Sequence, residues 1–157
     1  MKLDQRLIDA AIEFTEWRFP GAAYEGAAAM YTDDGEILIS TALDVPEGSS
    51  VHLCHEVGAM CEAYAKKKRI TATVCVSREP AGHFIILGLC GVCMERMWLW
   101  GGDVEIAVPL EDDATRWRSV TAFPATVTAE TGNEMSMRWA RFSNRTPAFV
   151  TRRSSIK

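Results

Sequence analysis

The chain has 157 residues, 48% of them hydrophobic, and a formal net charge of −4 at pH 7. This length and apolar content fit one globular domain with a hydrophobic core. No apolar run is long enough to cross a bilayer and the N-terminal residues lack a signal-peptide pattern, so we expect a cytoplasmic protein with no membrane partner. Cytoplasmic thiols stay reduced, so the five cysteines are expected to be free thiols or metal ligands rather than disulfides.

The charge is unevenly distributed along the chain. Residues 1–115 hold 9 lysines and arginines against 19 acidic residues, a balance of −10, whereas residues 116–157 hold 8 against 2, a balance of +6. The acidic part argues against DNA binding, because neutralisation of phosphate charge dominates that affinity. We therefore predict a domain at 1–115 and a C-terminal strand and helix extension at 116–157. Its basic tail is expected to pack on the same domain or on a neighbouring subunit, although RNA binding stays open.

Hydrophobic periodicity predicts alternating helices and strands. An amphipathic helix at 3–18 precedes a hairpin of strands at 26–31 and 36–41, which the Asp33-Asp34-Gly35 segment turns. The next predicted elements are a helix, a buried strand, an edge strand, a helix and a strand, at 54–68, 70–77, 84–87, 90–100 and 103–109.

The segment 71–108 is predicted as strand, helix, strand, which implies a right-handed crossover and parallel pairing. With the hairpin, this order favours an α/β sandwich with a mixed sheet. Beyond residue 110 we predict one more strand within 119–130, which Pro124 would confine to an edge, and a helix at 134–142.

The residues suited to chemistry lie in two segments, Leu53-Cys54-His55-Glu56 and Leu89-Cys90-Gly91-Val92-Cys93. Each segment lies where a loop enters a predicted helix, and a helix N-terminus favours the thiolate. The Cys-x-x-Cys spacing lets Cys90 and Cys93 reach one ion, and Cys54 supplies a third sulfur. Three protein ligands leave one tetrahedral position open, as in catalytic zinc sites. Glu56 follows Cys54 by two residues and would touch a water in that position.

Two different roles for these three cysteines stay open. They could be buried core thiols, since free cysteine is one of the most buried residue types. They could also form a structural zinc site, which requires a fourth ligand such as His52, His55 or His83 and leaves Glu56 incidental. The remaining cysteines, Cys61 and Cys75, are expected in the core.

These motifs resemble the zinc-dependent cytidine deaminase superfamily, in particular the free-nucleoside cytidine deaminases and blasticidin S deaminases. Cys54-His55-Glu56 is similar to the family's Cys-Ala-Glu, and Leu89–Cys93 is similar to its Pro-Cys-Gly-x-Cys. The segments 26–30 and 34–37 resemble its first hairpin, and the resemblance covers roughly residues 3–110. It implies a three-layer α-β-α sandwich with a mixed, mostly five-stranded sheet, in a homo-oligomer that is a dimer or a tetramer.

The resemblance also implies a reaction. The enzyme would hydrolytically deaminate a free pyrimidine nucleoside, such as cytidine, or a nucleoside analogue. Zn²⁺ would generate hydroxide that attacks the amino-bearing ring carbon. Glu56 would shuttle protons to the ring nitrogen and to the departing ammonia. The alternatives are a non-catalytic zinc-binding module with the same fold, and a deaminase of another amino-heterocycle or of a nucleotide.

Two departures from the family pattern indicate further site residues. The arginine that commonly follows the Cys-Ala-Glu glutamate is replaced here by Val57, so we expect His55, Arg96 or Arg78 to offset the charge of three thiolates. The family's ribose-binding Asn-x-Glu-Asn corresponds to Ala42-Leu43-Asp44-Val45. Asp44 is suited to replace the glutamate, whereas Ala42 cannot replace the asparagine; Tyr24 is a further candidate for the pocket wall.

Overall fold

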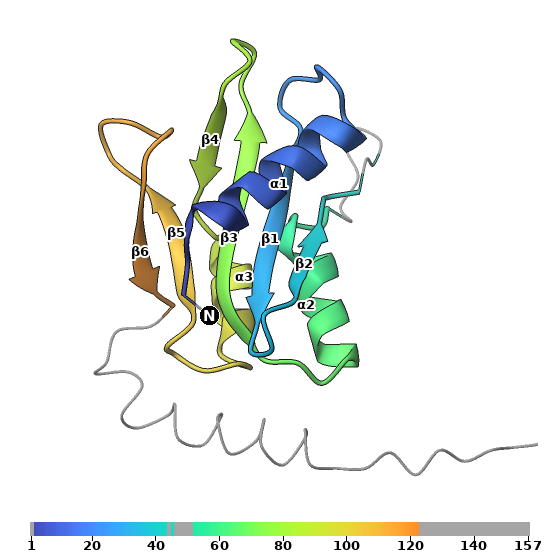
Figure 1. Ribbon diagram of the computed structural model, residues 1–157, viewed down its shortest axis with the longest axis vertical. Coiled ribbons are helices and arrows are strands. Elements are labelled where there is room, and N and C mark those ends of the chain that lie inside the picture. The colour runs from blue at the N-terminus through green and yellow to red at the C-terminus, as the bar shows by residue number, and fades with distance from the viewer. Residues whose placement is uncertain (1, 44, 46–51, 123–157) are drawn as a thin grey trace, which may run out of the picture.

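The computed structural model describes residues 2–43, 45 and 52–122 (Figure 1). The helices of that part are α1 (Gln5–Arg18), α2 (Glu56–Ala65) and α3 (Gly91–Met97). Its strands are β1 (Gly26–Thr32), β2 (Ile37–Ser40), β3 (Ile70–Arg78), β4 (Phe84–Leu87), β5 (Glu105–Pro109) and β6 (Trp117–Thr121). None of the helices within those ranges is both long enough and apolar enough to span a bilayer.

The strands form one mixed sheet of six in the order β2-β1-β3-β5-β6, with β4 joined to β3 off this path. β3 pairs in parallel with β5 only at Ala72 and Thr73. β4 pairs antiparallel with the other end of β3, from Cys75 to Arg78. The parallel crossover predicted for 71–108 is thus confirmed. The sheet has one strand more than the expected five, because 84–87 pairs along the part of β3 that β5 does not reach.

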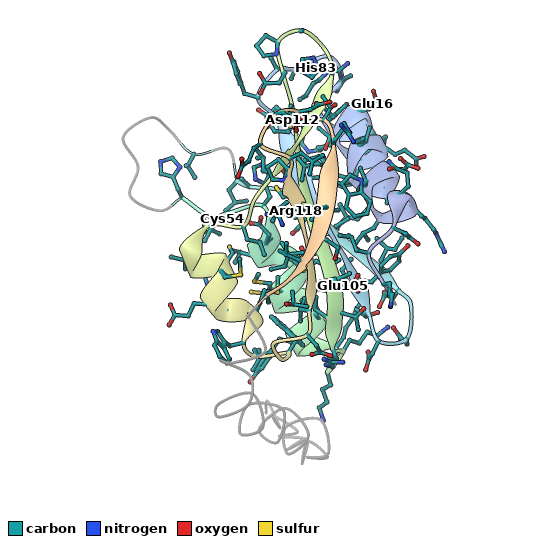
Figure 2. All side chains as sticks on the ribbon, turned by 90° about the vertical axis from the view of Figure 1, so that its left-hand side faces the viewer. Glu16, Cys54, His83, Glu105, Asp112 and Arg118 are labelled. Atoms are coloured by element: carbon teal, nitrogen blue, oxygen red, sulfur yellow. The ribbon has the colours of Figure 1, made fainter. Side chains whose placement is uncertain are left out.

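The sheet lies between two helical layers, which confirms the three-layer sandwich. Figure 2 shows α1, marked by Glu16, on one side of the sheet and α2 and α3, beside Cys54, on the other. The alternation of β1 supplies both cores, since successive strand residues point to opposite faces: Ala29 and Tyr31 lie in one cluster and Met30 in the other. Val74 and Val76 pack with Leu7 and Ala11 of α1, in one buried cluster. A second cluster joins Met30 and Ile106 of the sheet to residues of α2 and α3.

The small residues of β1 let the neighbouring parts of the structure approach this strand closely. Every residue of this strand is buried, and Ala27, Ala28 and Ala29 are fully so. At Gly26 an added Cβ would lie 2.1 Å from the carbonyl oxygen of Val76, so no larger residue fits there without moving β3. The apolar small-residue segment is therefore a central strand rather than a loop.

The buried face of α2 differs from the prediction for Cys61. That thiol was expected in the core but is exposed, whereas Glu56, Ala59, Met60 and Ala63 are buried. Several faces of this helix carry apolar residues, so periodicity alone did not fix its rotation. The two alanines permit the closer contact with the sheet and decide which face is buried. Cys75 is buried, as predicted.

The C-terminal extension begins with β6, which pairs along the whole of β5. This strand spans Trp117–Thr121, so it starts and ends earlier than the predicted 119–130 segment. Pro124, the predicted helix at 134–142 and the basic tail lie outside the described residues.

Truncation of Leu7 tests the α1 layer. Leu7 is fully buried, so we expect Leu7→Ala to lower the free energy of unfolding by about 2–5 kcal/mol, through lost burial and a residual cavity. Chemical denaturation measures the change. Trp17→Ala in the same helix is the control, because Trp17 is 75% exposed and its removal should cost about 0.5 kcal/mol. Equal losses for the two variants would contradict the assigned packing of α1.

Candidate functional site

Three thiols converge where α2 and α3 begin. Cys54 lies two residues before α2, Cys90 is the N-cap of α3 and Cys93 lies in its first turn. The Sγ atoms of Cys54 and Cys90 are 3.3 Å apart, and all three sulfurs lie within 4.8 Å of one another. In a tetrahedral zinc site with Zn–S bonds of about 2.3 Å, the sulfurs are about 3.8 Å apart. The arrangement therefore fits one ion held by three sulfurs.

The start of α3 stabilises one thiolate directly. The Cys93 backbone N–H donates to Cys90 Sγ at 3.4 Å, and this donor is the main cause that lowers the pKa of Cys90. The other two thiols shift the opposite way. The hydrogen bond with Cys90, together with burial, raises the pKa of Cys54. Burial and the Glu56 carboxylate raise the pKa of Cys93. Without a cation, the cluster therefore disfavours three simultaneous thiolates.

Glu56 is the first residue of α2 and only 4% exposed. Its Oε2 lies 3.5 Å from Cys93 Sγ, so the carboxylate faces the thiols rather than solvent. The position at a helix N-terminus favours its negative charge. Burial raises the pKa of the Cys75 thiol in β3, and the nearby Glu56 carboxylate raises it further. The sequence predicted Cys75 as core but gave no signal of this proximity.

No histidine joins the thiols in the part of the chain that the structure describes. Within that part, the group of side chains able to hold a metal consists of Cys54, Cys90 and Cys93 alone, although His52, His55 and His83 are all described. His83 lies in the turn between β3 and β4, far from Cys54 (Figure 2). The histidines considered as a fourth ligand are therefore not placed to complete a structural site.

The residues expected to offset the thiolate charge lie in different places. His55 is the N-cap residue of α2 beside Cys54, and burial lowers its pKa. Arg96 lies in the last turn of α3, three residues after Cys93. It lines a groove of about 440 Å³ between α2 and α3, with Met60, Tyr64 and other residues.

Arg78 stacks over the ring of Phe84, with 5.5 Å from its Cζ to the ring centroid. The donor that does reach a thiol is the backbone N–H of Cys93, which hydrogen-bonds to Cys90 Sγ.

The expected substrate-binding residues are only partly described. Ala42 follows β2 and is half-buried, whereas Asp44 lies outside the described residues. Tyr24 is 73% exposed and has a positive φ of 65°. Its N–H donates to the Arg78 carbonyl at 2.7 Å, so its backbone joins the ends of β1 and β3. Sequence reasoning also missed Ser40, which hydrogen-bonds to the start of α2.

Of three comparisons with known proteins, the comparison with solved structures found similar proteins. No family model and no curated protein matches the chain. Among solved structures, it is similar to the cytidine deaminase from Bacillus anthracis, at 33% identity and a TM-score of 0.71, over 87% of this chain and 97% of that chain. The cytidine deaminase from Mycobacterium leprae is 19% identical, with a TM-score of 0.57 over 77% of this chain and 95% of that one.

A third similar structure is the cytidine deaminase from Burkholderia pseudomallei, at 23% identity and a TM-score of 0.55, over 77% of this chain and 94% of that one. The two more distant structures show the fold. The match to the Bacillus anthracis protein, at one third identity over nearly the whole of that protein, shows that the chain belongs to the cytidine deaminase family.

Proposed function

We propose that the chain is a zinc-dependent hydrolytic deaminase of a free pyrimidine nucleoside, such as cytidine, or of a nucleoside analogue. The observation that carries this proposal is the placement of a buried carboxylate against three clustered thiols. Glu56 Oε2 is 3.5 Å from Cys93 Sγ, and the three sulfurs lie within 4.8 Å of one another. Membership of the cytidine deaminase family supports the reaction type.

Cys54, Cys90 and Cys93 would hold the metal as thiolates, a ligand set that suits zinc. Zinc supplies the Lewis acidity that makes water nucleophilic near neutral pH. Glu56 accepts a proton from the attacking water and delivers it to the ring nitrogen. It then transfers the second proton of that water to the departing amine. The net reaction consumes one water, replaces the ring amino group by a carbonyl oxygen and releases ammonia. The burial of Glu56 keeps bulk water from competing for that proton.

Recognition of the sugar is where this chain departs most from the family pattern. Ala42 stands where the family has an asparagine and offers only a methyl group. A site that lacks a hydrogen-bonding partner for a hydroxyl discriminates weakly for that hydroxyl. We therefore include nucleoside analogues, nucleotides and other amino-heterocycles among the candidate substrates. The acidic balance of residues 1–115 fits a small-molecule substrate better than DNA, and a homo-oligomer remains our prediction.

Replacement of Glu56 by glutamine tests the mechanism. Glu56→Gln keeps the shape of the side chain but cannot accept the proton, so kcat should fall by roughly 100- to 10,000-fold while zinc stays bound. Ammonia release across nucleosides, bases and nucleotides measures turnover, and metal analysis measures zinc. Glu62→Gln is the matched control, because Glu62 is an exposed glutamate of the same helix that pairs with Lys66. Turnover that survives Glu56→Gln would refute the assigned role.

Zinc binding should strengthen as pH rises. Cys54 and Cys93 have raised pKa values, so both are protonated at neutral pH without metal and must lose their protons when zinc binds. Each released proton strengthens binding about tenfold per pH unit, so these two thiols alone give at least about 100-fold between pH 6 and pH 7. Competition with a chelator of known affinity measures the dissociation constant at each pH. A constant that does not change with pH would exclude a thiolate site of this kind.

A further inference from the structure

Ser40, the last residue of β2, is hydrogen-bonded to the first turn of α2 through one hydroxyl. Its Oγ accepts from the Ala59 N–H at 2.9 Å and donates to the carbonyl oxygen of His55. An N–H and a C=O four residues apart pair directly with each other in a regular α-helix. The hydroxyl therefore bridges the two backbone groups that make the first helical hydrogen bond of α2.

This approach is possible only because residue 58 is glycine. An ideal Cβ at Gly58 would lie 2.7 Å from Ser40 Cβ and 3.3 Å from its Oγ. Real side chains essentially never come as close as the first of these distances, so an alanine would push β2 and α2 apart. Glycine is a poor helix former. The fit to Ser40 gives a physical reason for its presence in the first turn of α2.

Ser40 is itself held firmly by the sheet. It pairs with Ala28 of β1 in the antiparallel register of the two strands. The next residue, Thr41, donates its hydroxyl to the Gly26 carbonyl at 2.6 Å. The position of Ser40 is thus fixed by these contacts with β1.

The atoms that Ser40 holds lie between two residues of the site. His55, whose carbonyl accepts from Ser40, is flanked by Cys54 and Glu56. The Val57 N–H donates to the Cys54 carbonyl at 3.1 Å, so the backbone of this short segment turns as one unit. A rotation of this backbone segment would move the Cys54 sulfur and the Glu56 carboxylate together, away from Cys90 and Cys93 on the other helix.

We propose that Ser40 is a positioning residue for the site, with Gly58 as the complement that lets it reach the helix. The hydroxyl fixes the backbone of α2 at His55, and with it the geometry of the Cys54 thiol and the Glu56 carboxylate. The kinetic part of this inference rests on the proposed function, whereas the metal-binding part needs only the three thiols. Small displacements matter in such sites, because metal geometry and proton transfer tolerate little misalignment.

Ser40→Ala in the full chain removes the hydroxyl and leaves the packing of the Cβ. We expect the zinc dissociation constant, measured by chelator competition, to rise by roughly 10- to 100-fold. On fully zinc-loaded protein, kcat should fall within the same roughly 10- to 100-fold range with KM little changed. Thr15→Val is the matched control, since it removes a buried hydroxyl that donates to the Ala11 carbonyl at 2.8 Å on the opposite helical layer. This control variant should leave the zinc dissociation constant and kcat as in the wild type.

Gly58→Ala and the pair Ser40→Gly/Gly58→Ala complete a cycle. Gly58→Ala alone should weaken zinc binding and lower the unfolding temperature, because its methyl group meets Ser40. In the double variant the clash is gone, so the unfolding temperature should recover, while zinc binding should stay as weak as in Ser40→Gly. If Gly58→Ala binds zinc as the wild type does, or if Ser40→Ala lowers only the unfolding temperature, Ser40 is not a positioning residue.

The two proposals fail in different ways. The zinc constant is measured without substrate, so it decides the role of Ser40 even if the wild-type chain deaminates nothing. Absence of turnover in the wild type would refute the proposed function alone. An unchanged zinc constant in Ser40→Ala would refute the role of Ser40 alone.

Discussion

The site depends on one electrostatic constraint: four acidic groups crowd together at the N-termini of two helices. Glu56 is almost fully buried, and Cys93 is fully buried beside it. Burial and the adjacent Glu56 carboxylate raise the pKa of Cys93, and the hydrogen bond with Cys90 together with burial raises the pKa of Cys54. Such a cluster is stable in its ionised form only when a cation lies among the groups. The helix dipoles contribute to the same balance but act only as partial charges.

The rest of the fold places these groups within reach of one another. The parallel pairing of β3 with β5 sets α3 on the same face of the sheet as α2. Close contacts at two glycines then fix how the strands and α2 pack against one another. Gly26 lets β1 approach β3, and Gly58 lets Ser40 reach the backbone of α2. Side chains that carry chemistry are thus positioned by residues that carry none, which is typical of sites built on rigid elements.

Local patterns in the sequence were sufficient for much of this. The Cys-x-x-Cys spacing and the Cys54-x-Glu56 segment predicted residues that the structure brings together, because each motif spans only a few residues at the start of a helix. The β-branched, apolar composition of residues 70–77 predicted β3 as a buried strand, and residues 103–109 were predicted as another, β5. The predicted burial of Cys61 was wrong, because α2 carries apolar residues on several faces, and its packing places the face of Ala59 and Ala63, not that of Cys61, against the sheet. The Ser40–Gly58 contact also left no local signal, since it joins two elements across a loop.

The most direct test of this account is X-ray absorption at the zinc edge on the whole 157-residue chain loaded with one equivalent of zinc. Three thiolate ligands and an open fourth position predict about three sulfur scatterers at about 2.3 Å and one water oxygen at about 2.0–2.2 Å, without the outer-shell scattering of an imidazole ring. Binding of a substrate analogue should change the signal of that oxygen. A spectrum with four protein ligands, whether a fourth sulfur or a histidine, would show a closed structural site. It would contradict the claim that Glu56 faces a position where water can react.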